Sequence, residues 1–249
     1  MVYRSARLKL IALLLLLMAP PALAGGAVPA EFSRANEAYA RGDYQQAVGL
    51  YEALAAQDAP AALYYNLGNA YFKSGRIGKA VLNYERARRR APRDGDVRHN
   101  LRHLRGLVKE PPPSFAAAAL SRVAGWATVN ELAGAGAALL IITTAFLIVF
   151  LLRGGMGWAV GAGVALALLV VCAAWLGIAT RADGGARRAV VTGGTSEARN
   201  GPGADNTVAF TIAEGRIVLI LGEADGWRAV ALPRDGVTGW VPAGAVERV

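Results

Sequence analysis

Two long apolar segments stand out in the second half of the chain. Residues 132–152 contain no charged residue over 21 positions, and residues 156–180 contain none over 25. Each segment exceeds the ~20 residues that an α-helix needs to cross the hydrocarbon core of a membrane. Only Arg153, Gly154 and Gly155 separate them. The pattern therefore predicts two transmembrane helices, at 131–152 and 156–180, that form a tight hairpin.

A third apolar segment lies close to the N-terminus. Three basic residues lie within the first nine positions, ten apolar residues follow, and the segment ends in Ala22-Leu23-Ala24. This order is typical of a secretory signal peptide, so we expect one at 1–24 with cleavage after Ala24. An uncleaved membrane anchor is the alternative. In either case the residues that follow leave the cytoplasm, because the positive end stays inside.

The signal peptide and the hairpin together predict an orientation in a bacterial inner membrane. Both flanking domains would face the periplasm or the outside, and the hairpin turn would lie inside. The charges beside the hairpin alone favour the opposite orientation, because the turn carries only Arg153 and basic residues are enriched inside. The outer flanks carry Arg122, Arg181, Arg187 and Arg188. We give the signal peptide more weight because it acts first during synthesis.

Residues 61–94 carry the landmarks of a tetratricopeptide repeat over one repeat length of 34 residues. Leu67 and Tyr71 lie on the inner face of a first helix, where the small Gly68 permits a second helix to approach. Gly75 marks the turn between the helices, and Pro92 closes the unit. The pattern predicts a pair of packed antiparallel helices.

A weaker copy of this repeat precedes it, at 28–60, and a single helix follows at 95–109. Asn100-Leu101 in that helix repeats Asn66-Leu67. Stacked repeats need a cap over the last hydrophobic face, and the single helix fits this role. Residues 25–110 are therefore predicted to form an all-α tetratricopeptide-repeat solenoid.

Solenoids of this kind bind peptides or partner segments on the concave face formed by their first helices. The register of the repeats predicts which side chains line that face. They are Phe32, Asn36, Tyr39, Tyr65, Asn69, Phe72, Lys73, His99 and His103. The alternative is that some of them only pack between repeats. His99 and His103 have the spacing of a helical metal site, but no third ligand lies nearby in the sequence, so we expect no metal.

A series of arginines follows the second repeat. A solvated helix surface is the simplest interpretation, and contact with an acidic partner or with anionic lipid headgroups is the alternative. The members are Arg86, Arg88, Arg89, Arg90, Arg93, Arg98, Arg102 and Arg105.

Residues 111–130 predict a linker that begins with three prolines and continues into a helix at the membrane interface. After the second apolar segment we expect a loop at 184–194. Short strand patterns separated by turn residues then predict a small all-β barrel at 186–249. These patterns lie at 206–212, 216–221, 227–231, 239–241 and 245–249.

The C-terminal sequence resembles bacterial SH3 domains, and Gly239-Trp240-Val241-Pro242 is the most specific part. Domains of this kind bind peptides or cell-wall polymers, or serve as structural modules. Phe210, Trp227 and Trp240 are the candidate ligand site. The alternative is that the three aromatic side chains fill the barrel.

Composition narrows the class of function. The 249 residues are 54% hydrophobic and 18% charged, the formal net charge is +9, and the single cysteine excludes a disulfide scaffold. Of the net charge, +5 lies in residues 25–110, where 14 basic residues face 9 acidic ones. No dense basic tract interleaves with aromatic residues, so we expect no nucleic-acid binding. No nucleophile-and-base arrangement or phosphate loop is present in the sequence, so we expect no enzyme, cofactor or metal.

The order of the segments carries a further resemblance. Signal peptide, Tyr65-Asn-Leu-Gly-Asn-Ala-Tyr71, His99-Asn-Leu101, two spans and an SH3-like end together resemble the BatE family of the Bacteroides aerotolerance group. The resemblance implies an envelope scaffold associated with membrane proteins bearing von Willebrand A-type domains and with MoxR-type AAA+ ATPases. Membrane lipid is a further expected partner, and a cell-wall sensor that binds peptidoglycan through the SH3-like domain is the alternative.

Overall fold

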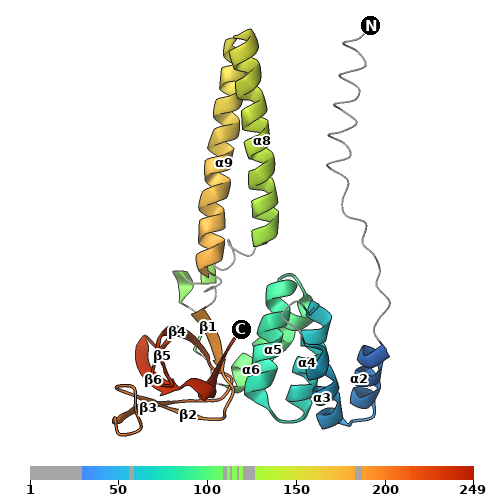
Figure 1. Cartoon of the computed structure of the whole chain (residues 1–249), viewed down its shortest axis with the longest axis vertical. Helices are drawn as coiled ribbons and strands as arrows, with labels where there is room; N and C mark the ends of the chain where they lie inside the picture. The colour runs from blue at the N-terminus through green and yellow to red at the C-terminus, as the bar shows by residue number, and fades with distance from the viewer. Residues whose placement is uncertain are drawn as a thin grey trace.

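The computed structural model describes residues 30–55, 59–108, 111–112, 114–116, 118–119, 127–182 and 187–249, with the backbone alone for 181–182. The predicted signal peptide and most of the predicted interfacial helix lie outside these residues. Figure 1 shows three parts: a group of short helices, a long helical hairpin and a C-terminal sheet. The short helices and the sheet lie side by side at the base of the hairpin.

Five short helices form the N-terminal part. They are α2 (Ala30–Ala40), α3 (Tyr44–Leu54), α4 (Ala61–Lys73), α5 (Ile77–Arg90) and α6 (Gly95–Leu107). Helices α2 and α3, and likewise α4 and α5, pack as consecutive pairs, and α6 packs on α5. The two predicted helix pairs and the single following helix are thus confirmed as helices. Helix α6 begins after Asp94, whose side chain accepts from the backbone N–H groups of Asp96 and Val97.

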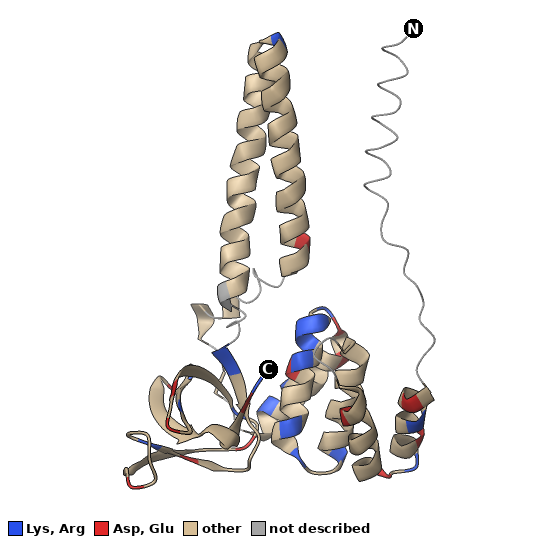
Figure 2. Ribbon diagram, viewed as in Figure 1, with Lys and Arg blue, Asp and Glu red and all other residues tan. Residues whose placement is uncertain are grey.

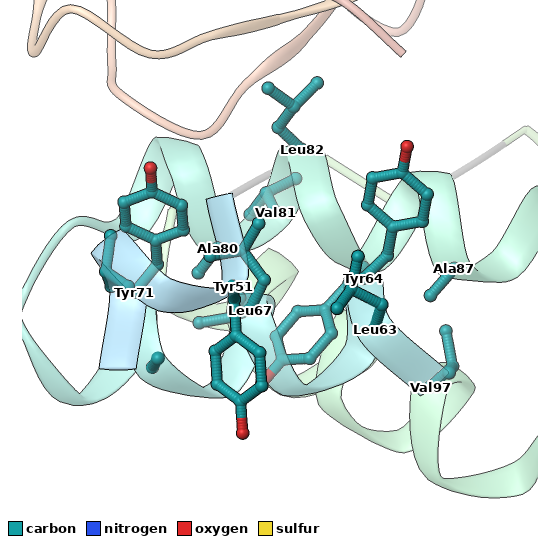
Figure 3. Close-up of a cluster of buried hydrophobic side chains, with 14 of the residues drawn as sticks. Tyr51, Leu63, Tyr64, Leu67, Tyr71, Ala80, Val81, Leu82, Ala87 and Val97 are labelled. Carbon is teal, nitrogen blue, oxygen red and sulfur yellow. The ribbon is translucent and has the colours of Figure 1, made fainter. Parts of the chain in front are cut away.

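Buried tyrosines and small residues fill the space between these helices (Figure 3). Tyr51, Tyr71 and Tyr84 are each about 1% exposed. A Cβ added at Gly68 would lie 2.8 Å from the ring of Tyr84, so this glycine is what lets α4 and α5 approach. The structure confirms the role predicted for Gly68.

Helices α8 (Val129–Arg153) and α9 (Met156–Ala182) form the hairpin. Gly154 and Gly155 make the turn with φ values of 65° and 100°, a backbone conformation that favours glycine. Both helices are long and apolar enough to cross a membrane. Many of their large apolar side chains are exposed, and Leu151 and Leu152 are 72% and 79% exposed.

Seven antiparallel strands form the C-terminal sheet. They are β1 (Arg188–Val191), β2 (Ser196–Arg199), β3 (Val208–Ile212), β4 (Ile217–Ala224), β5 (Trp227–Leu232), β6 (Val237–Pro242) and β7 (Val246–Arg248). Their order is β3-β2-β6-β5-β4-β1-β7. One face encloses its own apolar cluster, which includes Val191, Val230 and Val241. Strands β3 to β7 correspond to the five predicted patterns.

The expected loop at 184–194 is wrong in part, because β1 lies within it. Strand β1 pairs with β4 on one side and with β7 on the other. Its three apolar residues, Ala189 to Val191, are completely buried. Strand β2 follows it and was also not predicted. Both are only four residues long, too short for an alternation pattern to be distinguished from a loop.

Candidate functional site

The first helices α2, α4 and α6 carry all nine side chains predicted to line the concave face. We call these nine residues the first-helix surface. They are Phe32, Asn36, Tyr39, Tyr65, Asn69, Phe72, Lys73, His99 and His103. Lys73, His99 and His103 are exposed, and the other six are half-buried.

Two asparagines of this surface hold neighbouring repeats together. The Asn36 side-chain oxygen accepts a hydrogen bond from the Tyr51 hydroxyl at 2.6 Å and another from the Asn66 amide at 3.0 Å. One asparagine thereby ties α2 to α3 and to α4. Its side-chain oxygen is therefore engaged between repeats.

The same arrangement recurs one repeat later. The Asn69 oxygen accepts from the Tyr84 hydroxyl at 2.5 Å and from the Asn100 amide at 3.2 Å. The Asn100 amide also lies 3.5 Å from the Tyr65 hydroxyl. Burial raises the pKa of Tyr84 above its ordinary value, so the hydroxyl stays protonated and donates. Asn69, like Asn36, has a structural role.

The aromatic side chains of the first-helix surface are more exposed than Tyr51 and Tyr84, the buried tyrosines that bind the two asparagines. Phe32, Tyr39, Tyr65 and Phe72 pack against the helical core with one side and are only partly buried. The ring of Phe72 meets the exposed imidazole of His103 edge to face, with centroids 6.0 Å apart. The surface therefore leaves aromatic rings, which are enriched in protein interfaces, partly exposed beside the exposed side chains of Lys73 and His99.

His99 and His103 do not join a metal site among the residues that the structure describes, where no group of three His, Cys, Asp or Glu side chains comes together. Asn36 and Asn66 also do not form a carboxylate clamp, a site in which paired asparagine and cationic side chains hold a terminal carboxylate. The Asn66 amide instead donates to the side-chain oxygen of Asn36.

The three aromatic residues of the candidate SH3 site are divided between two faces of the sheet. Phe210 packs on the enclosed apolar cluster. Trp240 pairs with Ala229 across β5 and β6, and Trp227 pairs with Pro242. Side chains alternate along a strand, so both tryptophans lie on the face opposite Val230 and Val241, where each is half-buried. The structure places the two tryptophans on one face, two register positions apart on neighbouring strands, and Phe210 on the other face.

The arginine series is not a simple solvated surface. Arg88 and Arg105 bind the carboxylate of Glu85 at 2.9 Å and 2.7 Å, and Glu85 is completely buried. Arg86 donates to the backbone oxygen of Arg248 at 3.0 Å. These members of the series join α5 to α6 and to the C-terminal sheet, whereas Arg98 and Arg102 are exposed as predicted for a solvated surface. Figure 2 shows the basic residues along α5 in blue.

The repeat pattern did not predict the hydrogen bonds that tie the repeats together. The partners of Asn36 and Asn69 in these bonds are Tyr51, Asn66, Tyr84 and Asn100. The repeat pattern indicated Asn66 and Asn100 as a repeated position and not as hydrogen-bond partners. A signal for them was present, because the members of each pair Asn36/Asn69, Tyr51/Tyr84 and Asn66/Asn100 are 33 or 34 residues apart. No comparable signal exists for the buried Glu85, whose partners come from three separate elements.

Comparison with known families agrees with the helical part of the fold. Residues 61–94, which form α4, α5 and the turn after them, match the tetratricopeptide repeat. A search of curated proteins finds no match to the chain. The match covers the second predicted repeat with the predicted bounds, and tetratricopeptide repeats generally mediate protein interactions.

Proposed function

We propose that this protein is a membrane-anchored adaptor that binds an extended segment of another protein on its first-helix surface. One observation carries the proposal. The sheet packs against α5, while aromatic and basic side chains from α2, α4 and α6 remain accessible on the first helices. The hairpin supplies the anchor, because both of its helices are long and apolar enough to span a bilayer.

The resemblance to the BatE family gives the proposed setting. The partners are then membrane proteins with von Willebrand A-type domains, acting together with a MoxR-type ATPase in aerotolerance or a related stress response. The helical part and the sheet would face the periplasm from a bacterial inner membrane. In this proposal the chain binds and positions other proteins and catalyses no reaction of its own.

The sheet gives a second candidate function. We propose that it is an SH3-like barrel, which its antiparallel strands and enclosed apolar cluster support. Trp227 and Trp240 share one face of β5 and β6. A tryptophan side chain combines a large apolar ring with an N–H donor, which suits contact with sugar or peptide groups. Binding of peptidoglycan by these two residues would make the protein a cell-wall sensor.

Affinity purification of the full chain from mildly crosslinked membranes separates the two functions. If the protein is an adaptor, von Willebrand A-type membrane proteins should co-purify with it. The double variant Lys73→Glu/His103→Glu should recover at least tenfold less of these proteins. The matched control changes Gln45→Glu and Gln46→Glu, two exposed residues of α3, and should leave recovery unchanged.

Equal recovery from all three proteins would contradict the adaptor function of the first-helix surface. The sensor instead predicts that the full chain in detergent sediments with purified sacculi, and that Trp240→Ala abolishes this binding. Sedimentation that is unchanged by Trp240→Ala would contradict the sensor.

A further inference from the structure

The turn between α5 and α6 lies at the base of the hairpin. Both terminal nitrogens of Arg93 donate to the Glu131 carboxylate, each at 2.9 Å. Glu131 belongs to the first turn of α8, where it also closes a capping box with Thr128. The uncharged stretch of α8 begins at the next residue. If the hairpin spans a bilayer, this ion pair therefore places the α5–α6 turn at the level of the headgroups.

The last turn of α5 adds more positive charge at this level. Arg89 and Arg90 are exposed residues that end the helix. Arg89 also donates to the backbone oxygen of Val249 at 2.6 Å through one terminal nitrogen of its guanidinium group. The guanidinium carbon of Arg90 lies 4.6 Å from the ring centroid of Tyr64, which orients the side chain. A guanidinium offers five N–H donors in a planar fork that matches a phosphate group. We call Arg89, Arg90 and Arg93 the basic end of α5.

Two acidic side chains at this end are engaged within the chain. Asp94 accepts two backbone N–H groups as the N-cap of α6. Glu131 is bound by Arg93 and by the backbone N–H of Thr128. These two carboxylates thus stabilise helix starts, while Arg89 and Arg90 lie exposed at the end of α5.

A large aromatic side chain lies in the linker that precedes the hairpin. Phe115 is 88% exposed, and the described part of this linker is drawn in green in Figure 1. The linker begins against the sheet, because the Pro111 backbone oxygen accepts a hydrogen bond from Arg234 at 2.6 Å. Phenylalanine is common on the apolar face of helices that lie at a membrane interface. An almost fully exposed phenylalanine at this place is explained if the headgroup region covers it.

We infer that the basic end of α5 binds the phosphate groups of anionic phospholipids in the leaflet that the hairpin base enters. This inference rests on the proposed membrane anchoring and adds a lipid preference to it. An acidic protein segment offers the same charge. The lipid is favoured because the Arg93–Glu131 ion pair fixes these arginines beside the first turn of a membrane helix, where lipid is always present at high concentration.

The test measures lipid retention by the full chain. The protein is purified in detergent containing equal amounts of phosphatidylcholine and phosphatidylglycerol, and native mass spectrometry counts the lipids of each kind that stay bound. Each basic residue near a membrane surface changes affinity for anionic lipid about fivefold. We therefore expect Arg89→Gln and Arg90→Gln together to lower phosphatidylglycerol retention about tenfold or more, with phosphatidylcholine unchanged.

Two controls keep the result interpretable. Arg34→Gln with Arg41→Gln removes the same charge from α2 and the turn after it, where both residues are exposed, and should leave retention unchanged. Arg89→Lys with Arg90→Lys keeps the charge and should retain most of the phosphatidylglycerol. Circular dichroism verifies that each variant is folded.

Equal phosphatidylglycerol retention by the wild type and the folded glutamine variant overturns the inference. The inference is also overturned if the glutamine variant retains the lipid but no longer crosslinks to an acidic protein that the wild type binds. That result would identify a protein as the ligand. Alkaline carbonate extraction of the chain from membranes tests the anchoring separately. A chain that resists extraction but shows no lipid preference keeps its anchor and loses only this inference.

Discussion

Glu85 joins three parts of the chain through one buried carboxylate. It is completely buried, and its oxygens bind Arg88 of α5 and Arg105 of α6, with Arg188 of β1 3.6 Å away. Burial alone would raise the pKa of this carboxyl, but Arg188, Arg88 and Arg105 together lower it to about 2. The carboxylate therefore stays charged at neutral pH, as a buried ion pair requires.

Replacing Glu85 by glutamine should destabilise the chain by about 3 kcal/mol, because it leaves buried guanidinium groups without their carboxylate. The measurement is chemical unfolding of the full chain in detergent, followed by circular dichroism. Glu223→Gln is the matched control. Glu223 binds Arg228 and Arg248 on the sheet, but its side chain is 48% exposed, so its loss should cost less than about 1 kcal/mol.

The wild type and the Glu85→Gln variant should also differ in how their stability depends on pH. The folded-state pKa of Glu85, about 2, lies below the ordinary value of 4.5. A lowered pKa means that the stabilisation is fully present above the ordinary value and is lost as the pH falls towards the folded value. The stability difference between wild type and Glu85→Gln should therefore shrink between about pH 4.5 and pH 2. A difference that grows in this range would contradict the charge state assigned to Glu85.

At the scale of single residues, the sequence indicates local packing better than long-range partners. Gly68 was predicted to let two helices approach, and the ring of Tyr84 occupies the space that a side chain would need. Its partner is 16 residues away, within the same helix pair. Arg188 lies 103 residues from Glu85, and no periodicity connects residues at that distance.

At the scale of elements, α5 is the helix that α4, α6 and the sheet all contact. One side packs against α4, and the other receives the sheet. Gly78 donates its backbone N–H to Glu214 at 2.8 Å, and Lys79 binds Glu247 at 2.6 Å. Val190 and Ile217 of the sheet belong to the same apolar cluster as the helices. The helices and the sheet therefore share a core.

Two glycine substitutions test this contact with opposite expected signs. A Cβ at Gly78 would lie 2.8 Å from the Glu214 side chain and closer still to the Val191 oxygen. Gly78→Ala should therefore destabilise the chain by about 1–3 kcal/mol, as overpacking does. Gly49 in α3 has nothing within 4 Å of the same position, so Gly49→Ala should stabilise by up to about 1 kcal/mol through helix propensity.

Unfolding in detergent measures both variants. Hydrogen exchange then locates the effect, which for Gly78→Ala should be faster exchange in α5 and β1. A Gly78→Ala protein as stable as Gly49→Ala would show that the sheet does not pack closely on α5.

The elements themselves were predictable to different degrees. The apolar runs predicted both hairpin helices within a few residues of α8 and α9, because length and hydropathy alone define such helices. The landmarks of the 34-residue repeat predicted α4 and α5, because they follow a strongly periodic pattern. Strand β1 could not be predicted, since it has only three apolar residues and it becomes a strand by pairing with β4 and β7.

At the scale of the whole molecule, both ends of the hairpin return to the same side (Figure 1). The single cysteine, Cys172, lies in α9, so a Cys172→Ala background permits cysteine mapping. Lys73→Cys and Thr195→Cys should react with a membrane-impermeant maleimide in intact spheroplasts. Arg153→Cys, in the hairpin turn, should react only after the membrane is opened. Reaction of Lys73→Cys and Thr195→Cys on different sides would contradict the hairpin.

The proposed site was only partly accessible to sequence reasoning. The repeat register placed nine residues on the first helices, and the structure places them there. It did not reveal that Asn36 and Asn69 are bound by tyrosine hydroxyls of the second helices, because hydrogen bonds between helices depend on their packing. Lys73, His99 and His103 are therefore better probes of partner binding than the asparagines.

The most direct test of the central claim is site-specific photo-crosslinking in native membranes. A photoreactive residue at His99 or Lys73, both exposed on the first-helix surface, is compared with one at Gln45, exposed on α3. The account predicts crosslinks from His99 and Lys73 to a von Willebrand A-type membrane protein, and none from Gln45. Crosslinks to that protein from Gln45 alone, or from none of the three positions, would contradict partner binding on the first-helix surface.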